Sequence, residues 1–236
     1  MKKAVTHGAR QGATSTAPSL LSPPRRANGI ATRARLFDVA SEQFALTGYG
    51  GTSLRKIAAA ANVDLATLKY HFGDKATLFG EVYRVGHAAL LELLVPIAES
   101  LSVVENIREF DQKLTSLVSA TTVYLKRNQP FIRMHLFRLL EKPTEIIPLE
   151  KKLEEDVLSL MESTFEQLRA RGIVRAVDTR AVVVLLVTAL PTWYISAQAK
   201  PDWLRAQGDA EKRFEAFFLD LLRQLLRSDG AHPDDG

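Results

Sequence analysis

The chain of 236 residues contains no cysteine, which excludes disulfides and thiolate metal sites and fits a reducing compartment. It also lacks a long hydrophobic run: the longest, residues 181–190, has ten residues including Thr188. A membrane-spanning helix needs roughly 20. Residues 1–19 lack the apolar core of a secretory signal. We therefore expect a soluble, cytoplasmic protein that makes no membrane contact.

Motifs that carry catalysis or bind metals are also missing. The sequence contains no Gly-rich phosphate loop, no Gly-x-Ser-x-Gly elbow and no His-Glu-x-x-His pair. Two of the five histidines, His7 and His232, lie near the chain ends. The residues three positions before the other histidines are Leu68, Arg84 and Ile132, so the Glu-x-x-His ligands of a di-iron bundle are absent. We expect no enzyme activity, no metal and no cofactor.

Residues 52–75 carry the most informative pattern, which predicts two short helices joined by a tight turn. The apolar residues of the first helix recur at spacings of three and four, and those of the second do likewise: Leu54, Ile57, Ala58 and Ala61, then Leu65, Leu68 and Phe72. Thr52, Ser53, Asp64 and Asp74 stand where helix caps are needed. Two helices this short cannot bury their own apolar faces, so we expect a third helix, residues 32–47, to pack against them. This is the plan of a helix-turn-helix DNA reader.

The segment 32–83 resembles the N-terminal domain of the tetracycline-repressor (TetR) family of bacterial transcription regulators. The resemblance rests on many fixed spacings: Phe44, Gly48-Tyr49, Thr52-Ser53-Leu54, Ile57-Ala58, Ala61, Val63, Thr67-Leu68, His71-Phe72 and Lys75. Three positions depart from the family pattern. Asn62 stands where the family usually has the turn glycine, and Ala66 stands where Gly or Pro is common. Lys69 stands where the family most often has Tyr. The resemblance implies an all-α homodimer with a helical C-terminal domain that binds a small ligand.

This plan predicts DNA contacts on and beside the second short helix. Thr67, Lys69 and Tyr70 are the candidates for base edges, while His71 and Lys75 are candidates for phosphate contact. The full set of predicted contacts is Thr52, Ser53, Arg55, Ala66, Thr67, Lys69, Tyr70, His71 and Lys75. Tyr70 could instead pack on the helix behind it, and His71 could serve as a structural hydrogen-bonding residue.

Charge is distributed unevenly along the chain. Residues 1–35 hold seven Lys and Arg and no acid, whereas residues 36–86 hold five of each. We divide the chain into a basic arm (1–28) expected to be disordered, a helix-turn-helix domain (29–76), a helical regulatory and dimerisation domain (77–228), and a disordered tail (229–236). The arm either contacts DNA or stays solvated.

The regulatory segment is predicted to be helical throughout. Helices are expected at 75–95, 105–127, 129–141, from after Pro148 to Arg171, 178–199 and 209–227. The last two are unusually apolar, so they pair with their twofold mates in a dimer or form core helices of a monomer. Candidate ligand-binding residues are Tyr124, Phe131, Met134, His135, Phe137, Trp193 and Tyr194, which suggest an apolar or aromatic effector.

Two functions remain open at this stage. The first is a ligand-responsive, sequence-specific regulator, a repressor, that binds a palindromic operator in double-stranded DNA as a homodimer. The alternative is a helical ligand-binding or interaction protein that has lost sequence-specific DNA binding, which the balanced charge of residues 36–86 and the unusual Lys69 would suit.

Overall fold

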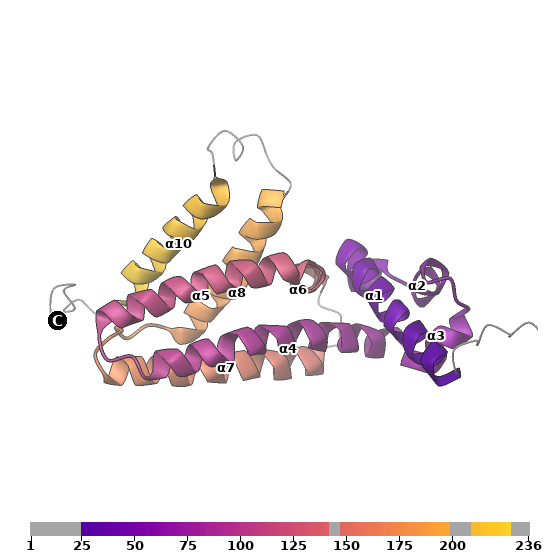
Figure 1. The fold of residues 1–236 in the computed structure, drawn as a ribbon, viewed down its shortest axis with the longest axis horizontal. Coiled ribbons are helices and arrows are strands. Elements are labelled where there is room, and N and C mark those ends of the chain that lie inside the picture. Colours follow the sequence, from indigo (N-terminus) through magenta and orange to yellow (C-terminus); the bar gives the residue numbers. More distant parts are fainter. Residues whose placement is uncertain (1–24, 142–146, 199–208, 228–236) are drawn as a thin grey trace, which may run out of the picture.

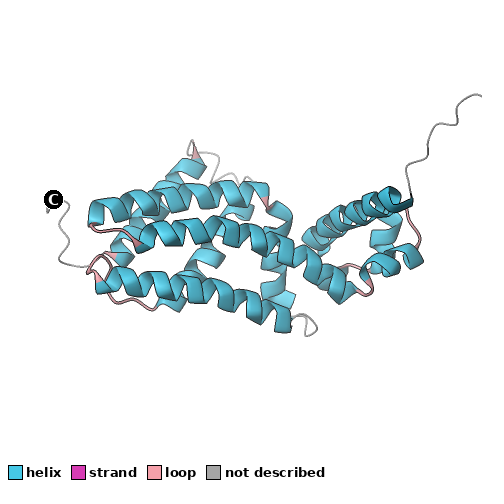
Figure 2. Ribbon diagram, turned by 60° about the horizontal axis from the view of Figure 1, so that its bottom comes forward, coloured by secondary structure: helices cyan, strands magenta, loops and turns pink. Residues whose placement is uncertain are grey.

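The structure is a computed structural model, and it describes residues 25–141, 147–198 and 209–227. Within these ranges the chain is α-helical: α1 (Arg25–Gly51), α2 (Leu54–Ala60), α3 (Leu65–Phe72), α4 (Lys75–Ser102), α5 (Ile107–Arg127), α6 (Gln129–Glu141), α7 (Ile147–Ala170), α8 (Thr179–Gln198) and α10 (Ala210–Leu226). The helices α1–α3 form a compact head at one end of an elongated molecule, and the remaining helices form the body (Figures 1 and 2). The all-α class expected from the sequence is confirmed.

The head is built around apolar side chains from all three of its helices. Leu36, Phe44, Ile57 and Leu68 are completely buried, as the spacing of apolar residues predicted. The guanidinium of Arg33 lies 4.6 Å from the centre of the Phe72 ring and pairs with Glu81 at the start of the body. The first helix begins at Arg25, so it includes residues 25–28 of the predicted arm. The rest of that arm and the predicted tail lie outside the described residues.

A sharp change in backbone direction interrupts α1 near its end. Gly48 has φ 69° and ψ −176°, a region that only glycine occupies without strain. The change of direction at Gly48 lets the chain lead into α2, which begins at Leu54. Ser53 then caps α2, because its hydroxyl accepts a hydrogen bond from the Lys56 amide.

The long helix α4 joins the head to the body and corrects one expectation. The sequence predicted an end at Val95, before Pro96, but α4 continues through Pro96 to Ser102. A proline inside a helix removes one hydrogen bond and crowds the preceding turn. Beyond it, Ala98 and Leu101 are buried against the body. Tertiary packing of this last segment therefore outweighs the local preference to stop.

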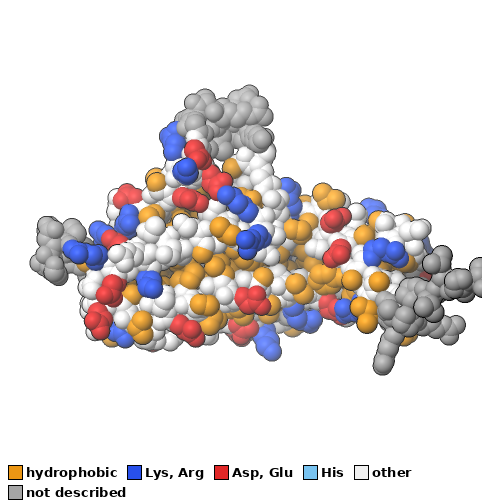
Figure 3. All heavy atoms as spheres, viewed as in Figure 1, with side chains coloured by type: hydrophobic (Ala, Val, Ile, Leu, Met, Phe, Trp, Pro, Cys, Tyr) orange, Lys and Arg blue, Asp and Glu red, His pale blue; other side chains and the backbone are white. Residues whose placement is uncertain are grey.

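The body packs around α4. Helices α5 and α7 lie along α4, α10 packs on α5, and α8 packs on α7 and α6 (Figure 1). Apolar side chains are visible along the seam where α5 lies over α4 (Figure 3). Apart from the end of α4, the observed boundaries in the body agree with the predicted ones within a few residues, including the stop at Gly172, which has φ 72°. Pro148 lies in the first turn of α7, where proline is well tolerated.

Helix α6 lies between the body and the head. It packs against α1 more extensively than against any other helix, and it also touches α4, α5 and α8. Its approach to α4 depends on Gly86, where a Cβ atom would lie 2.2 Å from the ring of Phe131. Glycine at this position therefore lets the aromatic ring of α6 sit directly on the α4 backbone.

Two helices, α4 and α8, are long and apolar enough by composition to cross a bilayer. Such helices also occur in the cores of soluble proteins, and here both pack against other helices of the body. The first residues of α4 are moreover part of the head, because Leu78 and Phe79 are buried in its core. This packing favours core helices over membrane spans.

Candidate DNA-binding face and ligand cavity

The turn between α2 and α3 has the geometry of a helix-turn-helix. Asn62 takes a positive φ of 52°, which confirms that asparagine can serve where the TetR pattern has glycine. The Val63 amide donates to the Ala58 carbonyl at 3.0 Å, which closes the turn. Asp64 then caps α3 by accepting from the Thr67 amide at 2.5 Å, and bonds from this amide and the Thr67 hydroxyl lower the pKa of Asp64.

The outer face of α3 is exposed, as a recognition helix requires. Leu68 and Phe72 are buried, whereas Ala66, Lys69 and Tyr70 are exposed on the opposite side. The Tyr70 side chain is 86% exposed, so the alternative in which it packs on the helix behind is wrong. These three residues have helical spacing and share one face of α3. The face presents an aromatic ring and an ammonium group to solvent.

The remaining predicted contacts lie around this face. Thr67 and His71 are half-buried, and Arg55 is exposed on α2. Ser53 is also exposed, although its hydroxyl caps α2. Lys56, which the sequence interpretation did not list, lies beside them with its ammonium 3.2 Å from the Gly51 carbonyl. Its position in the same helix turn as Arg55 could have suggested it.

Thr52 is not available for a DNA contact, contrary to the sequence prediction. Its side chain is 3% exposed. Its hydroxyl lies 2.7 Å from the Gly48 carbonyl and 2.8 Å from the Thr47 hydroxyl, so it satisfies polar groups at the end of α1. Thr52 therefore serves the internal structure of the head.

The ammonium group of Lys75 points inward as well. It donates to the carbonyls of Tyr49 at 2.9 Å and Thr52 at 3.2 Å, and lies 4.0 Å from the centre of the Tyr49 ring. Lys75 thus connects the start of α4 to the segment between α1 and α2. The contact with a DNA phosphate that the sequence predicted for Lys75 would require the ammonium to give up these two hydrogen bonds.

A carboxylate from the body holds the same segment from the other side. The Glu141 side chain, at the end of α6, accepts hydrogen bonds from the amides of Tyr49 at 2.8 Å and Gly50 at 3.1 Å. A Cβ atom on Gly48 would lie only 2.2 Å from a Glu141 carboxylate oxygen. No local pattern in the sequence pointed to Glu141, because its partners lie about 90 residues earlier in the chain.

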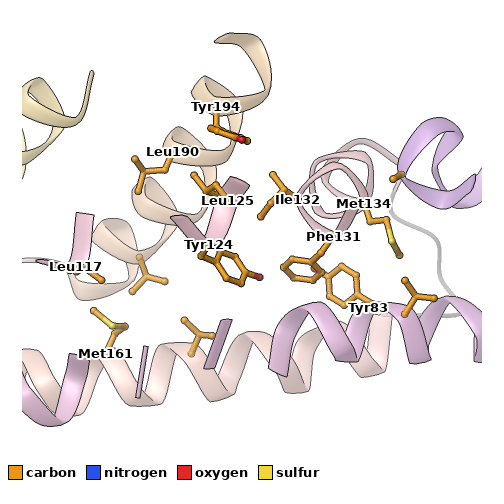
Figure 4. Close-up of a cluster of buried hydrophobic side chains, with 14 of the residues drawn as sticks. Tyr83, Leu117, Tyr124, Leu125, Phe131, Ile132, Met134, Met161, Leu190 and Tyr194 are labelled. Carbon is orange, nitrogen blue, oxygen red and sulfur yellow. The ribbon is translucent and has the colours of Figure 1, made fainter. Parts of the chain in front are cut away.

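The body contains a partly open cavity of about 290 Å³ between α4, α5, α6, α7 and α8. Its walls are mainly apolar, and aromatic rings of Tyr83, Tyr124 and Phe131 face one another at one side (Figure 4). The rings of Tyr83 and Phe131 lie 5.0 Å apart. Its volume is close to the lower end of the range for small-molecule sites.

Most polar groups of the cavity already have partners in the protein. The Tyr124 hydroxyl donates to the Gly86 carbonyl at 2.9 Å, and burial raises the pKa of this phenol. His87 Nε2 lies 2.8 Å from the Leu153 carbonyl. Arg138 forms an ion pair of 2.8 Å with Glu154. These three contacts use hydrogen-bonding groups of the wall within the protein itself.

His135 keeps part of its hydrogen-bonding capacity unused. Its Nδ1 lies 3.0 Å from the Tyr83 hydroxyl, whereas its Nε2 is buried without a hydrogen-bond partner. Burial, assisted by the nearby Arg138 charge, lowers the pKa of His135 to about 4, although the Val187 carbonyl opposes this shift. The imidazole is therefore neutral at pH 7.

Three of the seven predicted ligand-binding residues line the cavity: Tyr124, Phe131 and His135. The other four do not, which corrects the prediction. Met134 is buried at the end of the cluster nearest α1 (Figure 4), and Phe137 is half-buried outside the cavity. Trp193 stacks on Phe214 of α10 at 3.9 Å, while the Tyr194 hydroxyl accepts from Gln129 at 3.4 Å.

The sequence interpretation missed four ionisable residues of the cavity: Tyr83, His87, Arg138 and Glu154. Tyr83 and His87 lie four apart on α4, a spacing that places them on one helix face. That spacing could have suggested the pair. Arg138 and Glu154 lie on different helices, so only the packing of α6 beside α7 brings them together.

A three-helix head with an exposed face on its third helix, joined by one long helix to a body with an apolar cavity, is the architecture of helix-turn-helix transcription regulators. Residues 36–82 match the family described as bacterial regulatory proteins, tetR family. The HTH-type transcriptional regulator AcrR of Shigella flexneri is 39% identical over 62 residues, which cover 26% of this chain and 29% of that relative. The segment 36–82 therefore matches the DNA-binding domain of the TetR family, and the chain spans less than a third of the length of this curated relative.

Solved structures share the fold over most of the chain. The TetR family transcriptional regulator PfmR of Thermus thermophilus aligns with a TM-score of 0.55 at 24% identity, over 81% of this chain and 98% of that one. SCO4942 of Streptomyces coelicolor aligns with a TM-score of 0.60 at 16% identity, over 83% and 98% of the two chains. At these identities the likeness establishes the fold.

Proposed function

We propose that this protein is a cytoplasmic, ligand-responsive repressor that binds a palindromic operator as a homodimer and has no catalytic activity. One observation carries the DNA-reading part: Ala66, Lys69 and Tyr70 form an exposed face on a helix whose other side is buried in the head. In the groove, Lys69 can contact a base edge or a phosphate, and Tyr70 can pack on a base.

A dimer is supported by apolar side chains left exposed on the last two helices. Val184 on α8 and Phe217 on α10 are 56% and 64% exposed in the single chain. Pairing these helices with those of a second copy would remove both side chains from water. A twofold dimer would place two recognition helices about 34 Å apart, which matches successive major grooves and requires a palindromic site.

Ligand response is supported by the position of α6. One side of this helix contributes Phe131, Ile132 and His135 to the cavity, and its end places Glu141 against the segment after the α1 kink. A ligand that shifts α6 therefore displaces a direct contact to the head. Such a ligand changes DNA affinity by its difference in binding free energy between the two arrangements, about 1–3 kcal/mol in typical cases.

The DNA-binding part is tested by selecting binding sites from a random DNA library with the purified full-length protein. We expect a palindrome whose half-sites lie about one helical turn apart. Lys69→Ala and Tyr70→Ala should each reduce the preference for the selected site by about tenfold. Lys113→Ala is the matched control, because Lys113 is exposed on α5, in the body.

Two results would contradict the proposal. Recovery of no enriched sequence, with only weak and salt-sensitive binding, would favour an interaction protein that does not read DNA. Light scattering at micromolar concentration tests the dimer independently, since a species of 26.2 kDa would show that α8 and α10 do not pair.

A further inference from the structure

The imidazole of His135 brings to the cavity a hydrogen-bonding atom that the protein itself leaves unused. His135 projects from α6 into the cavity, and its Nε2 atom is buried without a partner. The Val187 carbonyl lies close enough to the imidazole to raise its pKa, but no hydrogen bond of ordinary length and angle joins it to Nε2. In a neutral imidazole one nitrogen carries the proton and the other accepts. We assign the proton to Nε2, because the Tyr83 hydroxyl, 3.0 Å from Nδ1, can donate to that nitrogen. The cavity then offers one N–H donor.

Water is a poor partner for this donor. A buried water molecule needs two to four polar partners. The neighbouring phenol of Tyr124 and the imidazole of His87 already bond to backbone carbonyls of the protein. An apolar ligand with one acceptor atom would satisfy His135 and the apolar wall together.

The charges at the cavity argue against an ionic ligand. Arg138 has a side chain that is 13% exposed, and it is neutralised by Glu154 at 2.8 Å. An anion would have to displace the Glu154 carboxylate, while a cation would meet the Arg138 guanidinium. The ion pair therefore disfavours both signs of charge in the ligand.

We propose that the effector is an uncharged, mainly apolar molecule with a hydrogen-bond acceptor, such as a ketone or ester carbonyl, which binds Nε2–H of His135. This inference rests on the proposed function, since it names the class of ligand that the regulator senses. His135 lies on α6 six residues before Glu141, so the ligand contacts the helix that touches the head.

Two pairs of probes test the two halves of this proposal by titration calorimetry on the full-length protein without DNA. Fluorenone and fluorene differ in the carbonyl acceptor but have nearly the same shape. Methyl decanoate and decanoate differ in charge. We expect fluorenone to bind about tenfold more tightly than fluorene, the effect of one buried hydrogen bond. We also expect the ester to bind more tightly than the carboxylate.

Variants at His135 identify the donor. His135→Phe should abolish the preference for fluorenone, while His135→Gln, which keeps an N–H donor, should restore part of it. Circular dichroism of each variant establishes that it is folded. The proposal is overturned by equal affinities for fluorenone and fluorene, by tighter binding of decanoate than of its ester, by a preference that survives in His135→Phe, or by failure of both probe shapes to bind.

Failure of the proposed function gives a different result. If fluorenone binds in a His135-dependent manner but does not change the affinity for the selected operator, the ligand class stands and the regulatory function does not. If the protein selects no operator at all, the proposed function fails, while the calorimetry without DNA still tests the proposed class of ligand.

Discussion

The contact between the end of α6 and the kink of α1 leads to a quantitative prediction about Gly48 and Glu141. Alanine at position 48 would meet two separate difficulties. The backbone has φ 69° and ψ −176°, and the new Cβ would lie 2.2 Å from Oε1 and 2.7 Å from Cδ of Glu141. The carboxylate would have to move away, and its bonds to the amides of Tyr49 and Gly50 would be lost with it.

Magnitudes follow from these contacts. A non-glycine residue in this backbone region costs about 2 kcal/mol. A hydrogen bond to a charged group contributes roughly 1.5–3 kcal/mol, which we reduce to about 1 kcal/mol for each bond here because Glu141 is exposed to solvent. Gly48→Ala should therefore cost about 4 kcal/mol, and Glu141→Ala about 2 kcal/mol.

The double variant distinguishes this explanation from independent effects. Once the Gly48→Ala substitution has displaced the carboxylate, removing Glu141 costs nothing further, so the double variant should also lose about 4 kcal/mol. Simple addition would give about 6 kcal/mol. The expected coupling free energy is therefore about −2 kcal/mol.

Urea denaturation followed by circular dichroism, at one fixed protein concentration, measures these free energies of unfolding. Gly50→Ala is the matched control. A Cβ on Gly50 would lie 3.6 Å from the carboxylate, an ordinary contact, and φ at this position is not positive. It should be neutral or stabilise by up to about 1 kcal/mol. Additive costs in the double variant, or a cost below about 1 kcal/mol for Gly48→Ala, would refute the reasoning.

Two further predictions concern Lys75 and His135. Lys75→Met, which keeps the apolar stem but removes two hydrogen bonds to carbonyls, should lower the free energy of unfolding by about 2 kcal/mol and Tm by about 4–8 °C. The salt dependence of DNA binding, measured by fluorescence anisotropy, should not change; a slope reduced by about one unit would show that Lys75 contacts a phosphate instead. His135 has its pKa lowered to about 4, so the unfolded chain binds an extra proton below pH 6.5. Stability should therefore fall as pH is lowered from 6.5 toward 4, and His135→Gln should lose that part of the dependence, as denaturation midpoints at several pH values would reveal. An unchanged pH profile in His135→Gln would contradict the assignment of a neutral buried imidazole.

Local features of the structure were predictable because they depend on interactions within one or two helical turns. The Ser53, Asp64 and Asp74 caps each bond to an amide three residues later. The positive φ of Asn62 and the exposed position of Lys69 follow from turn chemistry and helical spacing in the same way. The helix-turn-helix and the exposed face of α3 could therefore be predicted from the sequence.

Long-range features were decided only by tertiary packing. Pro96 ends a helix by local rules, yet α4 continues because the segment beyond it is buried. The helical pattern alone did not show whether Trp193 faces the cavity or another helix. In the structure its ring stacks on Phe214 of α10.

The sequence by itself determined the helices, their caps and the recognition face, because the forces involved act between residues a few positions apart. Only the tertiary structure decided that the Lys75 ammonium turns inward, that Nε2 of His135 is buried without a partner, and that Glu141 reaches the amides after Gly48. Such contacts join helices separated by tens of residues. An amphipathic pattern states that a face is buried but does not identify the helix that covers it.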